Sequence, residues 1–240
     1  MLTQRRAREQ RSNVTCIVVT PEAAPLLMFG SAASGAVAEL LRTRGIEFEA
    51  ASSAHETTTG EITLVPGQRE LNADIVVALP QLHPAHIAGL TSGFIPIDAH
   101  ARVPGLDGVY AAGDATMFPI KQGGLGTQQA DAAVEHIAAL VGAEIDPKPF
   151  HPILRGKLLT GDETISLRHD VTGGTGEGQA SPDYLWWPPH KVAGRYFAAW
   201  LGHSEPCDPE PPAQGSLEVE ISLPQEWHEQ PMALDPYGKL

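Results

Sequence analysis

The sequence has no long apolar run and very few cysteines. Among its 240 residues no stretch of about 18 apolar residues occurs, so no transmembrane helix is expected. Four arginines fall within the first eleven residues, but no apolar segment follows them, which argues against a secretory signal. Cys16 and Cys207 are far apart and form no CxxC motif, so no disulfide framework is expected. These absences together predict a cytoplasmic protein.

Basic residues are scarce. The chain has 16 Lys and Arg against 29 Asp and Glu, which gives a formal net charge of −13. Nucleic-acid binding needs clustered Lys and Arg, and an anionic membrane surface repels an acidic protein. This charge therefore excludes a nucleic-acid partner and leaves at most a peripheral contact with the inner face of the membrane.

The 24 glycines never fall in the spacing GxGxxG, which binds the pyrophosphate of a dinucleotide at the start of a helix. The Gly-rich stretch at residues 171–183, VTGGTGEGQASPD, misses this register and does not follow a buried strand. A metal site is not predicted either. His83 and His86 have a spacing that a metal could use, but no other group of ligands lies near them in the sequence.

The most informative stretch runs from Gly108 to Val141. Residues 109–112 are predicted to form a short buried strand that stops at Gly113, and a long helix is predicted from about Gly126. The helix positions expected to face a core are Ala130, Ala133, Val134, Ile137, Ala138 and Val141.

Asp114 follows directly after this predicted strand, at the edge where open α/β sheets bind ligands. The start of the helix, near Gly126 and Thr127, offers free N–H groups and a partial positive charge. Together they predict a ligand site built from a strand end, a turn and a helix start.

The run VYAAGDAT…PIKQGG…TQQADAA resembles the second flavin-contacting motif of the pyridine nucleotide-disulfide oxidoreductase superfamily. Within this superfamily of two-dinucleotide-fold flavoproteins, it is most similar to the branch of type II NADH dehydrogenases and sulfide:quinone oxidoreductases. The resemblance covers roughly residues 14 to 203 and is most specific over residues 73 to 141. It implies FAD and NAD(P)H as cofactors.

The resemblance also implies roles for particular residues. Asp114, after Gly113, would bind a ribityl hydroxyl of FAD. The loop Lys121-Gln122-Gly123-Gly124 and the helix start would stabilise negative charge on the reduced flavin. Lys121 is the candidate catalytic side chain, positioned to tune the flavin or donate a proton, with a solvated loop lysine as the alternative.

A further cofactor-binding candidate is Glu22. It follows the apolar run Val14 to Thr20, which is predicted to be a strand buried on both faces of a parallel sheet. The resemblance places Glu22 at the tip of a strand in the NAD(P)-binding domain, where an acidic side chain can bind an adenosine ribose. From the residues alone it is equally a surface glutamate.

The function implied is an FAD-dependent oxidoreductase that takes electrons from NAD(P)H or sulfide and passes them to a quinone-type acceptor. Sulfide oxidation in this branch uses redox cysteines near the flavin, and neither cysteine here falls at a recognisable position. That departure favours NAD(P)H or an unknown donor. The alternative is a non-catalytic, truncated homologue or subunit.

The predicted fold is α/β, a partial Rossmann-like two-dinucleotide-binding fold with a small carboxyl-terminal α+β domain. The predicted division is residues 1–80, a partial NAD(P)-binding domain; 81–146, the carboxyl-terminal part of the FAD-binding domain; 147–203, the small domain; and 204–240, an acidic Pro-rich tail. Because both GxGxxG units are missing, we expect a carboxyl-terminal portion of a longer enzyme, working as a homo-oligomer or with a missing amino-terminal half.

Other elements are predicted from local patterns. Strands are expected at residues 46–50, 61–65 and 75–79, and a helix capped by Ser31 or Ser34 should end at Gly45 with Val37, Leu40 and Leu41 inward. Residues 94–98 and 102–104 should form a pairing turn, and residues 154–159 and 163–168 a hairpin. A strand is also expected at residues 217–222. The aromatic cluster Trp186, Trp187, Tyr196, Phe197 and Trp200 suggests either packing of a third domain or a membrane or quinone surface.

Overall fold

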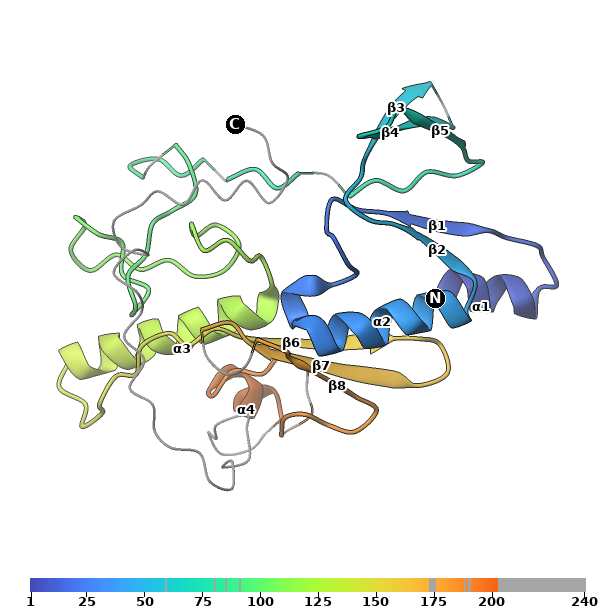
Figure 1. Cartoon of the computed structure of the whole chain (residues 1–240). Coiled ribbons are helices and arrows are strands. Elements are labelled where there is room, and N and C mark those ends of the chain that lie inside the picture. The colour runs from blue at the N-terminus through green and yellow to red at the C-terminus, as the bar shows by residue number, and fades with distance from the viewer. Residues whose placement is uncertain are drawn as a thin grey trace. The chain divides into compact units, whose positions relative to one another are not determined.

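The computed structural model describes residues 1–58, 60–79, 81–84, 86–90, 92–172, 176–187, 189 and 191–202 (Figure 1). The chain divides into two compact units. The first contains residues 1–81, 157–169 and 175–183, and the second contains residues 82–156, 170–174 and those from 184 onward. The four-domain division predicted from the sequence stays a prediction. The strand predicted at residues 217–222 lies outside the described residues.

A single βαβ motif forms the amino-terminal part of the first unit, after the short helix α1 (Leu2–Glu9). Strand β1 (Cys16–Val19) pairs in parallel with β2 (Ile46–Glu49), with Cys16 opposite Ile46. The 3-10 helix η1 (Leu27–Phe29) and helix α2 (Ser31–Thr43) make the crossover that a parallel pair requires. The predicted strands at residues 14–20 and 46–50 are therefore confirmed.

Helix α2 buries one face. Ala33, Val37 and Leu41 are 0%, 3% and 8% exposed, as their spacing predicts, whereas Leu40 is only half-buried. The predicted serine cap is wrong, because Gly30 occupies the N-cap position and buried Ser34 donates its hydroxyl to the carbonyl of Pro25 at 2.7 Å. The helix ends before Gly45, whose φ of +65° suits glycine.

Strand β1 is less buried than predicted. Ile17 and Val18 are 37% and 41% exposed, although the apolar run predicts burial on both faces. The reason is that β1 pairs only with β2 among the described residues, so the sheet is two-stranded.

A three-stranded antiparallel sheet follows, with β3 (Ser53–Thr58), β4 (Glu61–Val65) and β5 (Arg69–Asn72) in sequence order. Ile62 and Leu64 of β4 alternate inward, as a half-buried strand requires. This strand matches its prediction.

The strand predicted at residues 75–79 is wrong: this run pairs with no strand in the described part of the chain. Its residues Ile75, Val77 and Leu79 are 82%, 83% and 94% exposed.

The predicted hairpin is confirmed as β6 (Ile153–Leu159) and β7 (Thr164–Asp170), and β8 (Gln179–Ser181) adds a third strand. Leu154, Ile165 and Leu167 supply its buried apolar side chains. The turn uses Gly161, which has φ of +99°.

The second unit contains helix α3 (Gly123–Leu140), the short helix α4 (Phe197–Leu201) and a long irregular segment before α3. In this segment residues 94–98 and 102–104 meet only at the turn, where the N–H of Asp98 donates to the carbonyl of Arg102 at 3.0 Å. The predicted pairing of the two runs is wrong beyond that bond, because Ile95 bridges Thr116 and Arg102 bridges Tyr110 instead. The strand predicted at residues 109–112 is also wrong, because only Tyr110 takes part in a bridge, to Arg102.

The apolar stripe predicted for α3 does not face the described core. Ala133 is buried, but Val134, Ile137 and Val141 are 52%, 41% and 80% exposed. The inner face of α3 instead carries Leu125, Ala132 and two polar side chains, Gln129 and Glu135. These polar groups can be buried because hydrogen bonds satisfy them.

At the level of fold class the prediction is confirmed: the chain mixes α-helices and β-sheets and contains a βαβ motif. Among the described residues, no helix combines the length and the apolar character needed to cross a membrane.

Candidate cofactor-binding site

The loop that carries Asp114 is held in place by Ile95. The N–H of Ile95 donates to the carbonyl of Ala115 at 2.9 Å, and the N–H of Met117 donates back to Ile95 at 2.6 Å. Thr116, between them, is fully buried. Gly113 opens the loop with φ of +83°, which strains any residue with a side chain. The turn at Gly113–Asp114 is therefore a defined structure.

A buried glutamine ties this loop to α3. Gln129 is 1% exposed, and its Oε1 accepts the N–H of Gly113 at 2.7 Å. Its Nε2 donates to the hydroxyl of Thr116, which in turn donates to the carbonyl of Gly113 at 2.8 Å. The three residues close a ring of hydrogen bonds that fixes the loop against the helix.

Helix α3 starts three residues earlier than predicted, at Gly123, with Gln122 as its N-cap. No side chain of the described residues caps this end, and the N–H groups of Leu125 and Gly126 already donate to the carbonyl of Gln122, so the N–H groups of Gly123 and Gly124 are the ones open to a ligand. The helix approaches the Asp114 loop closely, since a Cβ on Gly126 would lie 2.9 Å from the Cα of Gly113. Only glycine allows this contact.

Loop and helix start together line a groove of about 570 Å³. The lining residues are Gly113, Asp114, Gly123, Gly126, Thr127, Ala130, Asp131 and Phe197. We name it the Asp114 groove. Asp114 is exposed, so its carboxylate is available to a ligand.

The other predicted loop residues stand beside this groove. Gln122 donates from Nε2 to the carbonyl of Arg155 at 3.0 Å, and its buried Oε1 would lie 3.2 Å from a Cβ on Gly124. Gln122 and Gly124 therefore shape the turn into α3. Their contact with a cofactor stays a prediction.

Lys121 is half-buried. Its ammonium group donates to the carbonyl of Thr116 and lies 4.0 Å from the ring centroid of Phe94. Burial lowers the pKa of Lys121 from its usual value, and the nearby Asp114 carboxylate partly opposes this effect. The Asp114 carboxylate thus acts on the Lys121 ammonium group, and the catalytic role of Lys121 stays a prediction.

Glu22 belongs to the first unit. It accepts the backbone N–H groups of Leu26 and Leu27, next to η1, and its pKa is raised by burial, which these hydrogen bonds partly offset. These hydrogen bonds hold the backbone near η1, and they do not test the predicted ribose contact of Glu22.

The cysteines give little further information: Cys16 is a half-buried free thiol in β1, and Cys207 lies outside the described residues. The described side chains include no group of three or more His, Cys, Asp or Glu arranged for a metal ion.

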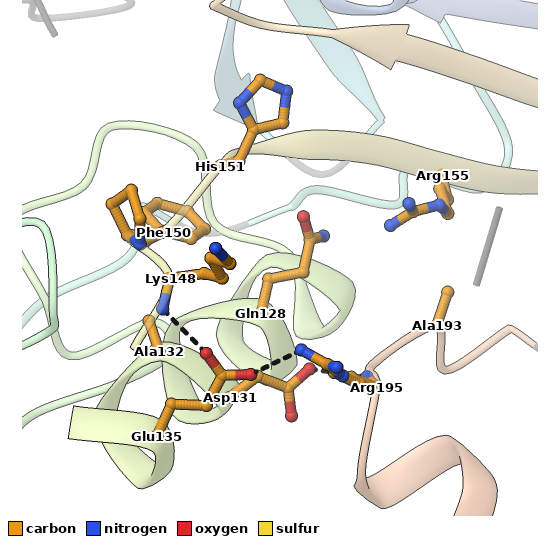
Figure 2. Close-up of a pocket in the computed structure, with 11 residues that line it drawn as sticks. Gln128, Asp131, Ala132, Glu135, Lys148, Phe150, His151, Arg155, Ala193 and Arg195 are labelled. Atoms are coloured by element: carbon orange, nitrogen blue, oxygen red, sulfur yellow. Dashed lines mark hydrogen bonds and ion pairs between the residues drawn. The ribbon is translucent and has the colours of Figure 1, made fainter. Parts of the chain in front are cut away.

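A second, smaller cavity of about 150 Å³ also borders α3 (Figure 2). Its charged lining includes Asp131 and Glu135, one helical turn apart, and Arg195. Glu135 is 3% exposed and accepts Arg195 Nη1 and the Tyr196 hydroxyl, both at 2.9 Å. It also accepts the backbone N–H of Lys148 at 2.8 Å. This acid pair was not predicted from the sequence, although two acidic residues spaced i, i+4 in an alanine-rich helix could have indicated it.

Asp131 lines both the groove and the cavity. Its Oδ2 accepts the N–H of Arg195 at 2.6 Å, and the N–H of Tyr196 also donates to this carboxylate. Burial nevertheless raises the pKa of Asp131 above its usual value. The folded protein therefore binds this proton more tightly than the unfolded chain does.

This shift predicts a pH dependence of stability. From about pH 3.8, the ordinary pKa of an aspartate, up to the raised pKa of Asp131, the folded state binds more protons. Its free energy of unfolding should therefore fall as the pH rises through this window. Asp131→Asn should remove that contribution, so the stability of this variant relative to the wild type should increase with pH.

Urea unfolding at a series of pH values measures this difference in stability, with Asp107→Asn, at an exposed position, as control. Parallel curves for wild type and Asp131→Asn would refute the assignment.

The aromatic residues of the carboxyl-terminal part divide into two groups. Trp186 is 2% exposed and belongs to the core, whereas Trp187, Phe197 and Trp200 are 61%, 48% and 70% exposed. The rings of Phe197 and Trp200 stack with centroids 5.9 Å apart.

Comparison with known proteins identifies a family. Residues 5–136 match the family model described as pyridine nucleotide-disulphide oxidoreductase. No curated protein matches the sequence.

Two solved structures illustrate the likeness of fold. A sulfide:quinone oxidoreductase from the hyperthermophilic bacterium Aquifex aeolicus is similar with a TM-score of 0.61 and 13% identity, over 75% of this chain and 48% of that one. LpdA from Mycobacterium tuberculosis is similar with a TM-score of 0.50 and 18% identity, over 64% of this chain and 35% of that one. The chain thus spans about half the length of the Aquifex protein and a third of LpdA.

Proposed function

The chain belongs to the pyridine nucleotide-disulphide oxidoreductase family, and from this premise we propose that it is the part of an FAD-dependent oxidoreductase that holds the ribityl chain and the polar edge of the flavin. The observation that carries the proposal is the Asp114 groove. There an exposed carboxylate, a glycine turn and an uncapped helix start meet in one place.

The residues present fit a flavin. Asp114 offers an acceptor for a hydroxyl group, and the open N–H groups at Gly123 and Gly124 suit an electronegative ring edge. The close approach of Gly126 to Gly113 leaves backbone, rather than side chains, lining that end of the groove. A pocket for a planar, hydrogen-bonding ligand needs such a surface.

A bound flavin would supply the two-electron redox chemistry between a donor and an acceptor. Asp114 orients the cofactor through the ribityl hydroxyl. The amino end of α3 stabilises negative charge at the edge of the ring, since the helix dipole and its free N–H groups favour an anion. Lys121 adjusts this field through its interaction with Asp114.

For the reaction we propose NAD(P)H as electron donor and a quinone-type small molecule as acceptor, with a cytoplasmic location at or near the inner face of the membrane. The fold likeness to the Aquifex sulfide:quinone oxidoreductase supports the acceptor class only as an analogy. A sulfide donor is less well supported, because Cys16 and Cys207 are far apart in the sequence and form no CxxC motif.

The second candidate is a non-catalytic subunit that acts only with an amino-terminal half. The absence of GxGxxG from the sequence and the exposed apolar run at residues 75–79 favour it. Absorption spectra separate the two: a flavin band in the purified chain supports the enzyme, and a colourless oligomer supports the subunit.

The role of Asp114 predicts a loss of affinity. Asp114→Ala should weaken FAD binding by about 1.5–3 kcal/mol, or about 10- to 150-fold, because a hydrogen bond to a charged group is removed. The FAD affinity of Asp114→Asn should fall between those of the wild type and Asp114→Ala. The test uses the chain joined to a βαβ unit that carries GxGxxG, so that the pyrophosphate anchor makes FAD binding tight enough for a loss of about 150-fold to be measured. The control is Asp107→Ala, at an exposed position in the same compact unit of this chain as Asp114. An unchanged Kd with an intact fold would remove Asp114 from the site.

A further inference from the structure

The segment that follows Ala193 is fastened to α3 at several points. Asp131 accepts two backbone N–H groups, those of Arg195 and Tyr196, and Glu135 accepts the guanidinium and the hydroxyl of the same two residues. Glu135 is 3% exposed, so its contacts with Arg195 and Tyr196 are charge-assisted and partly buried. We name residues 194–200 the strap.

Steric fit reinforces these bonds. A Cβ on Gly194 would lie 2.1 Å from Cγ2 of Thr127 and 3.0 Å from Oδ2 of Asp131. The strap backbone therefore lies directly on the first turns of α3, where only glycine fits.

The fastening has a consequence for the groove. Phe197 comes two residues after Arg195, and it lines the Asp114 groove together with Gly113 and Asp114. Phe197 is 48% exposed, and its ring stacks on Trp200 with an interplanar angle of 15°. An exposed aromatic ring at the wall of a groove, supported by a second ring such as that of Trp200, offers a stacking surface to a flat ligand.

We propose that the strap, latched to α3 through Asp131 and Glu135, presents the Phe197 ring as a wall of the Asp114 groove, where it stacks against the planar ring of the ligand. This inference rests on the proposed flavin site and adds a ring-binding wall from a segment that lies beyond the matched residues 5–136. Asp131 and Glu135 are then positioning residues, since they act on the ligand only through the strap.

The latch can be tested by sterics, without removing a charge. Gly194→Ala should push the strap off α3, because the added Cβ would clash with Cγ2 of Thr127. Adding Thr127→Ser deletes Cγ2 and should let the strap pack on α3 again. The hydroxyl of residue 127 keeps its bond to the carbonyl of Gly123. Hydrogen exchange of the amides at residues 195–201 should rise in Gly194→Ala and return toward the wild-type rate in the double variant. Thr127→Ser alone is the control and should exchange like the wild type. Unchanged exchange in Gly194→Ala would overturn the latch.

The wall can be tested with FMN, which brings the flavin ring without the second nucleotide. Titration of the full chain to millimolar FMN, followed by flavin fluorescence, should show weak binding that falls roughly 3- to 10-fold in Phe197→Leu, because aromatic stacking is lost. Gly194→Ala should lose as much, and Gly194→Ala/Thr127→Ser should recover it. Circular dichroism confirms the fold in each variant.

The outcomes separate the two claims. Equal FMN affinity in wild type and Phe197→Leu would overturn the wall and leave the Asp114 groove standing. No FMN binding by the wild type would overturn the flavin assignment and the wall with it, while the exchange data would still decide the latch.

Discussion

Glu135→Ala is expected to destabilise the protein by about 2–4 kcal/mol. Removing one partner of a buried ion pair typically costs about 3–5 kcal/mol. Arg195 is 39% exposed at its side chain, so solvent screens part of the interaction and the expected value is lower. The same carboxylate also accepts the Tyr196 hydroxyl and the Lys148 N–H, and both lose this acceptor.

Urea unfolding at neutral pH measures the effect. Tyr196→Phe removes one neutral donor to Glu135 and should cost only about 0.5–1.5 kcal/mol. Glu144→Ala, at an exposed position just after α3, is the matched control and should change stability by less than about 0.5 kcal/mol. If Glu135→Ala behaved like Glu144→Ala, the acid pair would not hold the strap.

The residues that the sequence placed correctly are those whose neighbours lie close in the chain. In β4, Ile62 and Leu64 alternate with exposed residues, and the hairpin of β6 and β7 turns at Gly161. In α2, Val37 and Leu41 recur at the helical period. Such patterns need only local geometry and a single buried face to be read.

The residues at 75–79 and 109–112 show where this reading stops. Both runs are apolar and resemble buried strands, but a strand exists only when another backbone satisfies its N–H and C=O groups. Tyr110 forms one β-bridge, to Arg102, and residues 75–79 form no strand pairing with the described residues. A sequence pattern cannot state whether the pairing strand is present.

The candidate site was predicted only in part for a related reason. Asp114 and the start of α3 could be predicted, because a carboxylate after an apolar run and a Gly-rich helix start are local signals. Gln129 could not be, because burying its amide depends on the loop at Gly113 and Thr116 arriving at the same place. Phe197 lies 83 residues after Asp114 in the sequence, and only the folded strap brings it to the groove.

The second large effect concerns what the sequence lacks. We expect the 240 residues expressed alone to retain little or no FAD through purification, because no GxGxxG segment anchors the pyrophosphate at a helix start. Joining the chain to a βαβ unit that carries GxGxxG, by fusion or as a second chain, should raise FAD affinity by about 100-fold or more. Two charged hydrogen bonds of about 1.5–3 kcal/mol each are sufficient for this gain.

The same addition should change association. Alone, the chain exposes the apolar run with Ile75, Val77 and Leu79 and the α3 stripe of Val134, Ile137 and Val141, so size-exclusion chromatography should show oligomers or aggregates. The control is the same βαβ unit with its three glycines replaced by valine, which keeps the added surface but blocks the pyrophosphate. If that control retained FAD equally well, the glycines would not be the anchor. A yellow monomer carrying one FAD per chain without any added unit would mean that the 240 residues bind the pyrophosphate themselves, and the search for its site would then turn to the open helix start at Gly123.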